Sequence, residues 1–313
     1  MTEAKKKRKN APWGHAFLAL AFFFLTGLFI KNSGLAAEYV RSALALCVHT
    51  VIPSVFPSAV IAGIFTALGG GEFISHLFAR PMRSLFGLSG AGATVLFFGW
   101  SCGFPVGAVT GAALVRRGEL SEDELSRLMI FSNLPSPAFV ISAVGEGMLG
   151  ERRTGIILYL ILLSISFLTG IVLRFFSSSQ EKYEAKAETR RGLAGAVASS
   201  VSSAAFSMLS LCASVVFFSV LAKTLLSAIG AFSSALLSAA IGCIFEISGG
   251  CASAAALGGK CSVALCAFAL GWSGFGVHFQ IISAAEYMKK LPLYFSFKFI
   301  IGIIAAATAI VTI

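Results

Sequence analysis

The sequence predicts an all-α, polytopic membrane protein with about seven spanning helices and two re-entrant hairpins in an inverted repeat. Of its 313 residues, 57% are apolar and 12% are charged, whereas a soluble domain carries about 25% charged residues. As many as 32 consecutive uncharged residues separate Arg83 from Arg116, and roughly 20 apolar residues suffice to cross a bilayer. The net charge of +10 lies mainly at the ends of apolar runs, which fits membrane topology and predicts no nucleic-acid partner.

The N-terminal part, 1–32, is predicted to be a basic cytosolic tail and a first membrane helix. Lys5–Lys9 form the basic front, and the apolar run 13–30 follows. No small-x-small cleavage site follows it closely, so an uncleaved helix is expected rather than a signal peptide. A second apolar segment lies between Arg41 and Glu72. Residues 73–88 mix arginines with apolar residues, which is typical of a helix in the membrane interface.

The first predicted repeat, 33–176, contains two interrupted segments. Glycines and a proline at 99–107 break the apolar run 89–115, which predicts a re-entrant hairpin. Ser121 and Glu124 have the spacing of a capping box and predict a helix start. That helix is broken by the polar and proline residues of 129–137, and a plain spanning helix follows over 154–173.

The second predicted repeat, 206–313, has the same order and follows a polar linker and interfacial helix at 177–205. Its predicted elements are a spanning helix at 206–229, a hairpin at 232–259 broken at 245–250, a helix at 261–285 broken at 271–276, and a plain helix at 292–313. With a cytosolic N-terminus, the two hairpins enter from opposite faces, which makes the repeats inverted. The positive-inside rule favours this topology, because Arg80, Arg83, Arg116, Arg117, Lys289 and Lys290 then share the cytosolic side.

The four breaks predict a shared solute site near the midplane of the membrane. Backbone freed from helical pairing is tolerated at membrane depth only inside protein or beside a wet cavity, and inverted-repeat transporters gather such breaks at their substrate site. The alternative is that glycines and prolines only kink packed helices. The candidate substrate-binding residues at the breaks are Ser101, Gly103, Pro105, Ser132, Asn133, Ser136, Ser248, Gly249 and Ser273.

Glu246 and His278 complete the candidate site. Glu246 has 22 uncharged residues before it and 13 after it, and an acid at that depth is a functional candidate by default. It could carry a coupling proton, ligate Na⁺ or accept hydrogen bonds from the solute. The alternative is a neutral acid bonded to a backbone amide of its own hairpin. His278 ranks second, because a lone histidine is more often a packing residue than a proton relay.

Enzymatic function is not expected. The sequence has no paired carboxylates, no metal-spaced His and Cys set and no Walker motif, so no metal or other cofactor is expected beyond a possible coupling H⁺ or Na⁺. Its seven cysteines lie mostly in apolar runs without C-x-x-C spacing, which favours buried thiols. The expected partners are the lipid bilayer and a small-molecule solute, and a homo-oligomer remains open.

Five short motifs resemble a known family: Gly103–Ala108, Glu124–Arg127, Ser132-Asn133, Pro137–Phe139 and Glu246–Gly250. They are similar to the YlbJ-type sporulation integral membrane proteins of the nucleoside-recognition, or Gate, group. That group is related to the gate of ferrous iron transporters and resembles the core of concentrative nucleoside transporters. The resemblance implies passage of a dianion such as dipicolinate across the forespore membrane during endospore formation. The open alternatives are an ion gate or channel subunit and a structural protein that acts through a partner.

Overall fold

Every regular element in the described part of the chain is a helix. The computed structural model describes residues 12–31, 33–176, 192–228 and 234–313, and no strand occurs in these ranges. The all-α prediction is therefore confirmed. The predicted basic tail at Lys5–Lys9 and the polar linker at 177–191 lie outside the described residues.

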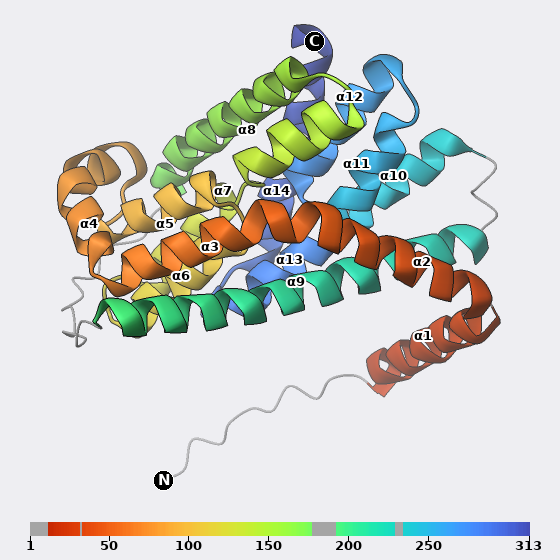
Figure 1. Cartoon of the computed structure of the whole chain (residues 1–313), viewed down its shortest axis with the longest axis horizontal. Coiled ribbons are helices and arrows are strands. Elements are labelled where there is room, and N and C mark those ends of the chain that lie inside the picture. The colour runs from red at the N-terminus through yellow and green to blue at the C-terminus, as the bar shows by residue number, and fades with distance from the viewer. Residues whose placement is uncertain (1–11, 32, 177–191, 229–233) are drawn as a thin grey trace.

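Two long antiparallel helices form one side of the molecule (Figure 1). The first is continuous from α2 (Ser33–Leu46) through a π-helical turn, η1 (Cys47–Val51), into α3 (Ile52–Ala67), and the second is α9 (Leu193–Ala228). Gly63 faces Ser200 near one end of the pair, and the Lys223 ammonium lies 4.8 Å from the centre of the Tyr39 ring near the other. Because α9 runs unbroken through residue 206, the predicted interfacial helix and the predicted span are one rod.

The first repeat continues from α3 with a bent pair and a hairpin. α4 (Gly70–Pro81) and η2 (Met82–Phe86) lie at 87° to α5 (Ala91–Ser101). α5 and α6 (Val106–Arg116) pack against each other as the predicted hairpin. Each of these two helices has 11 residues, about 16 Å at the helical rise and too short to cross a bilayer.

The predicted broken helix follows, and its start is confirmed in detail. α7 (Glu122–Phe131) begins at a capping box in which Glu124 N donates to Ser121 Oγ at 3.1 Å and Ser121 N donates to Glu124 Oε2 at 3.1 Å. α7 ends at the break that begins with residue 132, and a π-helix, η3 (Ala138–Met148), follows the break. α8 (Arg152–Leu173) and the short 3₁₀ turn η4 (Arg174–Phe176) come next.

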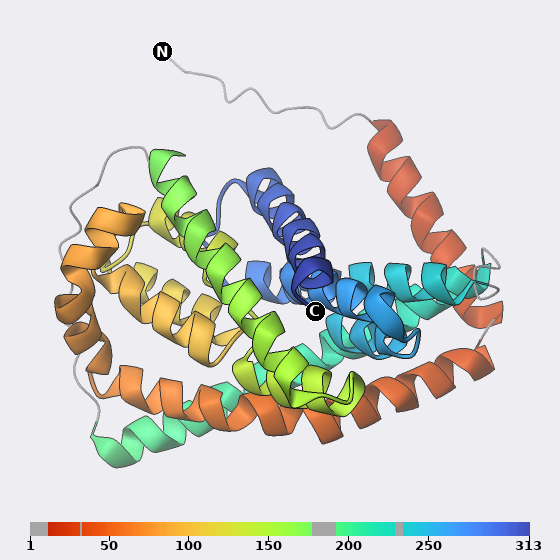
Figure 2. The ribbon, with the colours of Figure 1, turned by 90° about the horizontal axis from the view of Figure 1, so that it is seen from above.

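The second repeat has the same order of elements. α10 (Ala235–Phe245) and α11 (Ile247–Ala255) form a hairpin, α12 (Gly259–Trp272) and α13 (Gly274–Ala284) form a helix broken at residue 273, and α14 (Leu291–Thr312) ends the chain. α14 packs beside α8, so the last helices of the two repeats are neighbours (Figure 2).

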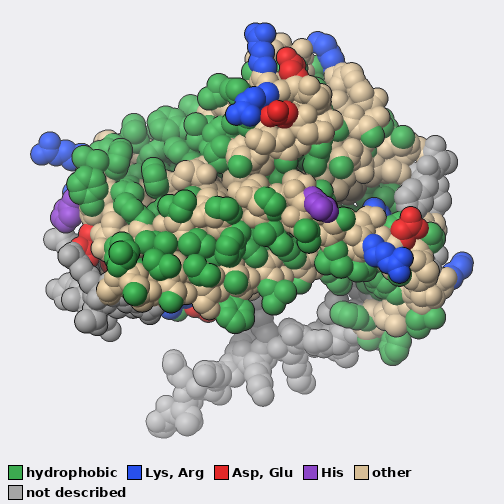
Figure 3. Space-filling model, in the orientation of Figure 1, with side chains coloured by type: hydrophobic (Ala, Val, Ile, Leu, Met, Phe, Trp, Pro, Cys, Tyr) green, Lys and Arg blue, Asp and Glu red, His purple; other side chains and the backbone are tan. Residues whose placement is uncertain are grey.

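The surface suits a lipid environment. In the described ranges, five helices are long and apolar enough to cross a membrane, or six if the bent pair that contains α4 and α5 counts as one span. The predicted number of seven spans stays a prediction, as does the re-entrant depth of the hairpins. Figure 3 shows a broad apolar face with charged side chains at its margins. Residues predicted for the cytosolic side meet in ion pairs, which are Arg116–Glu286, Lys289–Glu122 and Lys290–Asp123.

Candidate functional site: two breaks around a central cavity

The tip of the first hairpin packs tightly on the break between α7 and η3. A methyl group added to Gly99 would lie 2.3 Å from Ser132 O, and one added to Gly103 would lie 2.5 Å from Ser136 N. Gly103 also has φ +77°, a conformation that other residues rarely adopt. Only glycine therefore allows this approach of hairpin to break. The turn closes with a cis peptide bond between Phe104 and Pro105.

Protein donors satisfy the backbone carbonyls of the first break. Phe131 O accepts hydrogen bonds from Trp100 Nε1, at 3.1 Å, and from Ser166 Oγ. Each of the next three carbonyls accepts one hydrogen bond. Ser132 O accepts from Leu134 N at 3.1 Å, Asn133 O from Lys298 Nζ at 2.9 Å and Leu134 O from Phe104 N at 3.2 Å.

This pairing bears on whether the freed carbonyls need water or solute as partners. Freed carbonyls at membrane depth need partners, and the sequence alone suggests water or solute in that role. In the structure, side chains of α5, α8 and α14 and the backbone of the hairpin tip take it instead. Pro135 and Pro137 also bring no N–H group that would need an acceptor. The break by itself therefore does not require a ligand at these four carbonyls.

Glu246 caps the second half of the second hairpin. Its buried carboxylate accepts hydrogen bonds from Ser248 N at 2.8 Å and Gly249 N at 2.6 Å, at the start of α11. This geometry agrees with the alternative of a carboxyl group bonded to its own hairpin. It also fills the positive end of α11 that an anion would otherwise use. A methyl group on Gly274 would lie 3.2 Å from Glu246 Cα, so the second break packs on this tip.

A tryptophan connects hairpin and broken helix in each repeat. Trp100 of α5 donates to Phe131 O at the end of α7, and Trp272 of α12 donates to Ile244 O in α10, at 3.0 Å. Each indole joins a helix of the hairpin to a helix of the broken pair close to the interruption. The two repeats therefore use the same device, although the tryptophan lies on the hairpin in one and on the broken helix in the other.

A small cavity lies where the two hairpin tips and the two broken helices meet. Its volume is about 30 Å³, room for about one water molecule. Three polar side chains lie on its wall: Ser136 beside the first break, Ser248 in the second hairpin and Gln280 in α13. Apolar residues of α3, α9 and both repeats complete the lining, namely Val51, Val55, Phe104, Pro135, Phe139, Leu211, Val215, Ile247 and Val277. The structure thus brings the two predicted hairpins and the two broken helices to one point.

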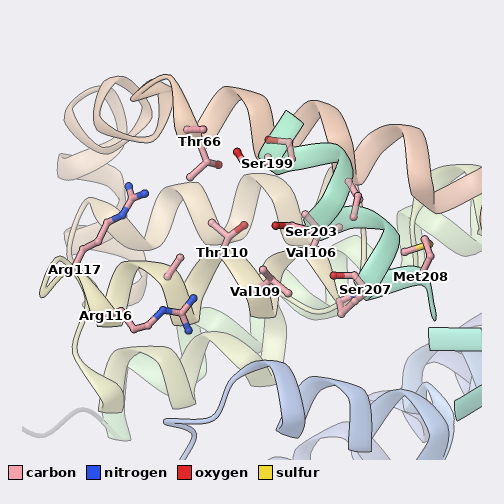
Figure 4. A pocket seen from close by; sticks show the side chains of 17 residues that line it. Thr66, Val106, Val109, Thr110, Arg116, Arg117, Ser199, Ser203, Ser207 and Met208 are labelled. Carbon is pink, nitrogen blue, oxygen red and sulfur yellow. The ribbon is translucent and has the colours of Figure 1, made fainter. Parts of the chain in front are cut away.

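A second cavity, of about 570 Å³, opens between α3, α6 and α9 (Figure 4). Hydroxyl groups from all three helices line it, most of them from one face of α9, and Arg116 and Arg117 lie at one end. No Asp or Glu is among the described residues that line it. We call this cavity the vestibule. Its hydroxyl-bearing residues are Thr66, Thr110, Ser199, Ser200, Ser203 and Ser207.

The two cavities follow one another along the groove between α3 and α9. The inner end of the vestibule is lined by Ala59, Pro105 and Met208, and the central cavity by Val55, Phe104 and Leu211. Ala59 and Val55 are one helical turn apart on α3, and Met208 and Leu211 are one turn apart on α9. Pro105 directly follows Phe104. A thin apolar layer therefore separates the vestibule from the point where the repeats meet.

The remaining predicted residues lie around these cavities rather than on them. Ser101 is exposed and donates to Phe97 O. Buried Ser132 and Asn133 belong to the first break, and Asn133 Oδ1 and Ser132 Oγ have no hydrogen-bond partner among the described residues. Ser273 is buried in the left-handed conformation, with φ +78°, which is uncommon for serine.

His278 packs behind the second break rather than on the central cavity. Its ring lies 4.3 Å from that of Trp272 and 5.1 Å from that of Phe295, measured between centroids, and Nδ1 lies 2.8 Å from Tyr294 Oη. Of the predicted residues, only Ser136 and Ser248 therefore line the central cavity, and Pro105 lines the vestibule.

Sequence reasoning missed two buried polar residues. Lys298 was included in a plain final helix, yet its side chain is buried and reaches the first break. Its signal was available, because a lone lysine inside an apolar spanning run is a functional candidate. Gln280, which lines the central cavity, follows the same rule less strongly. Position on a helix face, which decides whether such a residue points inward, could not be read without the packing.

Comparison with known proteins agrees with this architecture. Residues 48–152 match the family model described as nucleoside recognition and named Gate. The match covers about a third of the chain. It runs from η1 to the start of α8 and so contains the first hairpin and the first break. The chain is also 27% identical, over 172 residues, to the sporulation integral membrane protein YlbJ of Bacillus subtilis (strain 168). No solved structure matches.

The resemblance expected from the hairpin motifs is thus confirmed. The aligned region covers 55% of this chain and 42% of the Bacillus protein, so the chain spans less than half the length of the relative that it matches. The match to the Gate model, the relative's name and the apolar helices together support an integral membrane protein with several crossings. Solute and orientation are separate questions.

Proposed function

We propose that this protein is a transporter that moves a small anionic or polar solute across a membrane during endospore formation. One observation carries the proposal: a hydroxyl-lined vestibule leads to a cavity at the junction of two repeats whose helices are broken there. Alternating access needs such a junction, because one repeat can move against the other around it. The link to sporulation rests on the name of the Bacillus relative.

The vestibule favours an anion. Two arginines lie at one end, one of which, Arg116, also pairs with Glu286 outside the lining. No described acidic residue lines the vestibule, and serine and threonine hydroxyls can donate hydrogen bonds along it. Its volume of about 570 Å³ lies in the range of small-molecule sites. A dianion of the dipicolinate kind, which the family resemblance suggests, has the charge and size for this path.

The described conformation is closed at the centre. A cavity of about 30 Å³ holds no solute larger than water, so a cycle of transport has to widen it. Phe104 and Met208 border the apolar layer between the two cavities. We therefore propose that solute reaches the central cavity when the first hairpin tip moves away from α9.

Uptake into proteoliposomes tests the function. Labelled dipicolinate and nucleosides are offered to wild type, to a double variant Arg116→Gln and Arg117→Gln, and to a matched control, Arg152→Gln and Arg153→Gln, at the far end of α8. We expect saturable uptake of the anion, with a KM raised about tenfold or more in the vestibule variant and unchanged in the control. Absence of saturable uptake, together with electrical conductance, would instead establish the ion-gate alternative.

Cysteine labelling tests the path without any substrate. Ser203→Cys places a thiol in the vestibule, whereas Ser202→Cys places one on the exposed outer face of α9. The thiolate attacks the thiosulfonate reagent and displaces its sulfinate to form a mixed disulfide, and thiolates form in water and not in lipid. A water-filled vestibule predicts faster labelling at 203 than at 202, measured by mass above the wild-type cysteines. Equal labelling rates at both positions would contradict an aqueous path that is confined to the vestibule.

A further inference from the structure

Lys298 is a buried lysine with no acidic partner in the part of the chain that the structure describes. It lies on α14, seven residues after the helix begins, roughly 10 Å along its axis. Its side chain is 1% exposed. A charge in such a place is retained only when something compensates for its lost hydration. Among the described residues, its ammonium group donates to a backbone carbonyl, Asn133 O, at 2.9 Å.

That carbonyl belongs to a place that suits a monovalent cation. It lies just beyond the C-terminus of α7, where the helix dipole is negative. Neutral oxygens surround the break, and two of them, Asn133 Oδ1 and Ser132 Oγ, are buried without a hydrogen-bond partner among the described residues. In inverted-repeat transporters, unwound carbonyls and half-helix C-termini of this kind coordinate the coupling ion.

We propose that Lys298 is a tethered cation that takes the place of a coupling Na⁺ at the break of the first repeat. Its ammonium supplies the single positive charge, and the α14 backbone holds it there. A freely bound Na⁺ is therefore not needed at this break. A direct consequence, which rests on the proposed transport function, is that uptake proceeds without a Na⁺ gradient.

The arrangement differs from that of an ordinary surface lysine. A lysine near a helix end usually extends its ammonium to the interface, where water solvates it. Lys298 instead crosses from the last helix of the second repeat to the break of the first. It thereby joins the repeats at the level where they have to separate, which is also where a coupling ion acts.

Thermal unfolding of the purified protein tests the cation site independently of transport. Melting temperature is measured in choline chloride and in NaCl at equal ionic strength, for wild type, for Lys298→Ser and for a matched control, Lys260→Ser, on the exposed end of α12. The serine variant removes the ammonium and leaves the oxygens of the break. At roughly ten times its Kd, a newly bound Na⁺ would raise the melting temperature of that variant by about 3 to 6 °C.

We expect wild type and the Lys260 variant to melt at the same temperature in both salts, and Lys298→Ser to gain stability in NaCl. Specific stabilisation of wild type by Na⁺ would overturn the proposal even if the variant fails to fold. A folded Lys298→Ser with the same melting temperature in both salts would also overturn it. Uptake that needs a Na⁺ gradient would overturn it while leaving the transport function intact. The expected melting behaviour without any uptake would leave the cation site standing and remove the transport function.

Discussion

Replacement of Gly99 by alanine tests the close approach on which the first half of the site depends. The added methyl carbon would lie 2.3 Å from Ser132 O and 3.0 Å from Ser132 C, whereas real contacts of this kind are about 3.4 Å or longer. The hairpin therefore has to move away from the break by about 1 Å. That movement strains two hydrogen bonds across the same contact, from Trp100 Nε1 to Phe131 O and from Phe104 N to Leu134 O.

The size of the effect follows from these terms. Overpacking costs about 1–3 kcal/mol, two weakened hydrogen bonds cost about 1 kcal/mol each, and alanine returns about 1 kcal/mol through its better helix propensity. The net loss is about 2–4 kcal/mol, or about 4–16 °C in melting temperature. Gly195→Ala is the matched control, because Gly195 is also helical and an added methyl group meets nothing within 4 Å.

Heating the detergent-solubilised variants and measuring the remaining monodisperse protein by size-exclusion chromatography provides both melting temperatures. The control is expected to equal or slightly exceed wild type. If Gly99→Ala melts within about 2 °C of Gly195→Ala, the hairpin and the break are not in the described contact. The proposed junction of the repeats would then lose its first half.

Three further variants test the caps and the tryptophan ties by the same melting assay. Glu246→Gln keeps one acceptor for the α11 amides and replaces the other with an amide N–H group, so a loss of about 1–2 kcal/mol is expected; an unchanged melting temperature would contradict the cap. Ser234 is an exposed N-cap of α10, where its Oγ accepts from Leu237 N at 3.3 Å. Ser121→Ala is expected to lose about 1 kcal/mol and more than Ser234→Ala, and the reverse order would refute the capping box as a stabilising feature. Trp272→Phe keeps an aromatic ring but leaves Ile244 O without its donor, so a loss of about 1–3 kcal/mol in stability is expected. Full stability would show that this hydrogen bond is dispensable.

The sequence predicted the interruptions better than their consequences. Glycine at 103, proline at 135 and serine followed by glycine at 273 locate the breaks because local backbone chemistry decides them. The capping box at Ser121 was equally local and is confirmed. The matched order of breaks in the two halves predicts a two-repeat architecture, and this stays a prediction.

Partners across the fold were beyond such reasoning. Nothing local to residue 133 reveals that its carbonyl will meet an ammonium from residue 298, 165 positions later. Nor does the α9 sequence reveal that its serines face α3 and α6, because its small and large residues are spread around the helix without a clear polar stripe. The vestibule is a property of three helices at once, and so it emerged only in the structure.

The pairing of the first break constrains how any transport cycle can run. Donors from α5, α8, α14, the hairpin tip and the break itself satisfy its carbonyls, so a motion that separates the hairpin, α8 or α14 from the break has to remove at least one donor. In a membrane interior, the carbonyl left behind costs a few kcal/mol unless another donor arrives. Water or a polar solute can supply it, whereas lipid cannot. Opening is therefore coupled to hydration of the break, and the hydroxyl-lined vestibule is the described cavity from which that water can come.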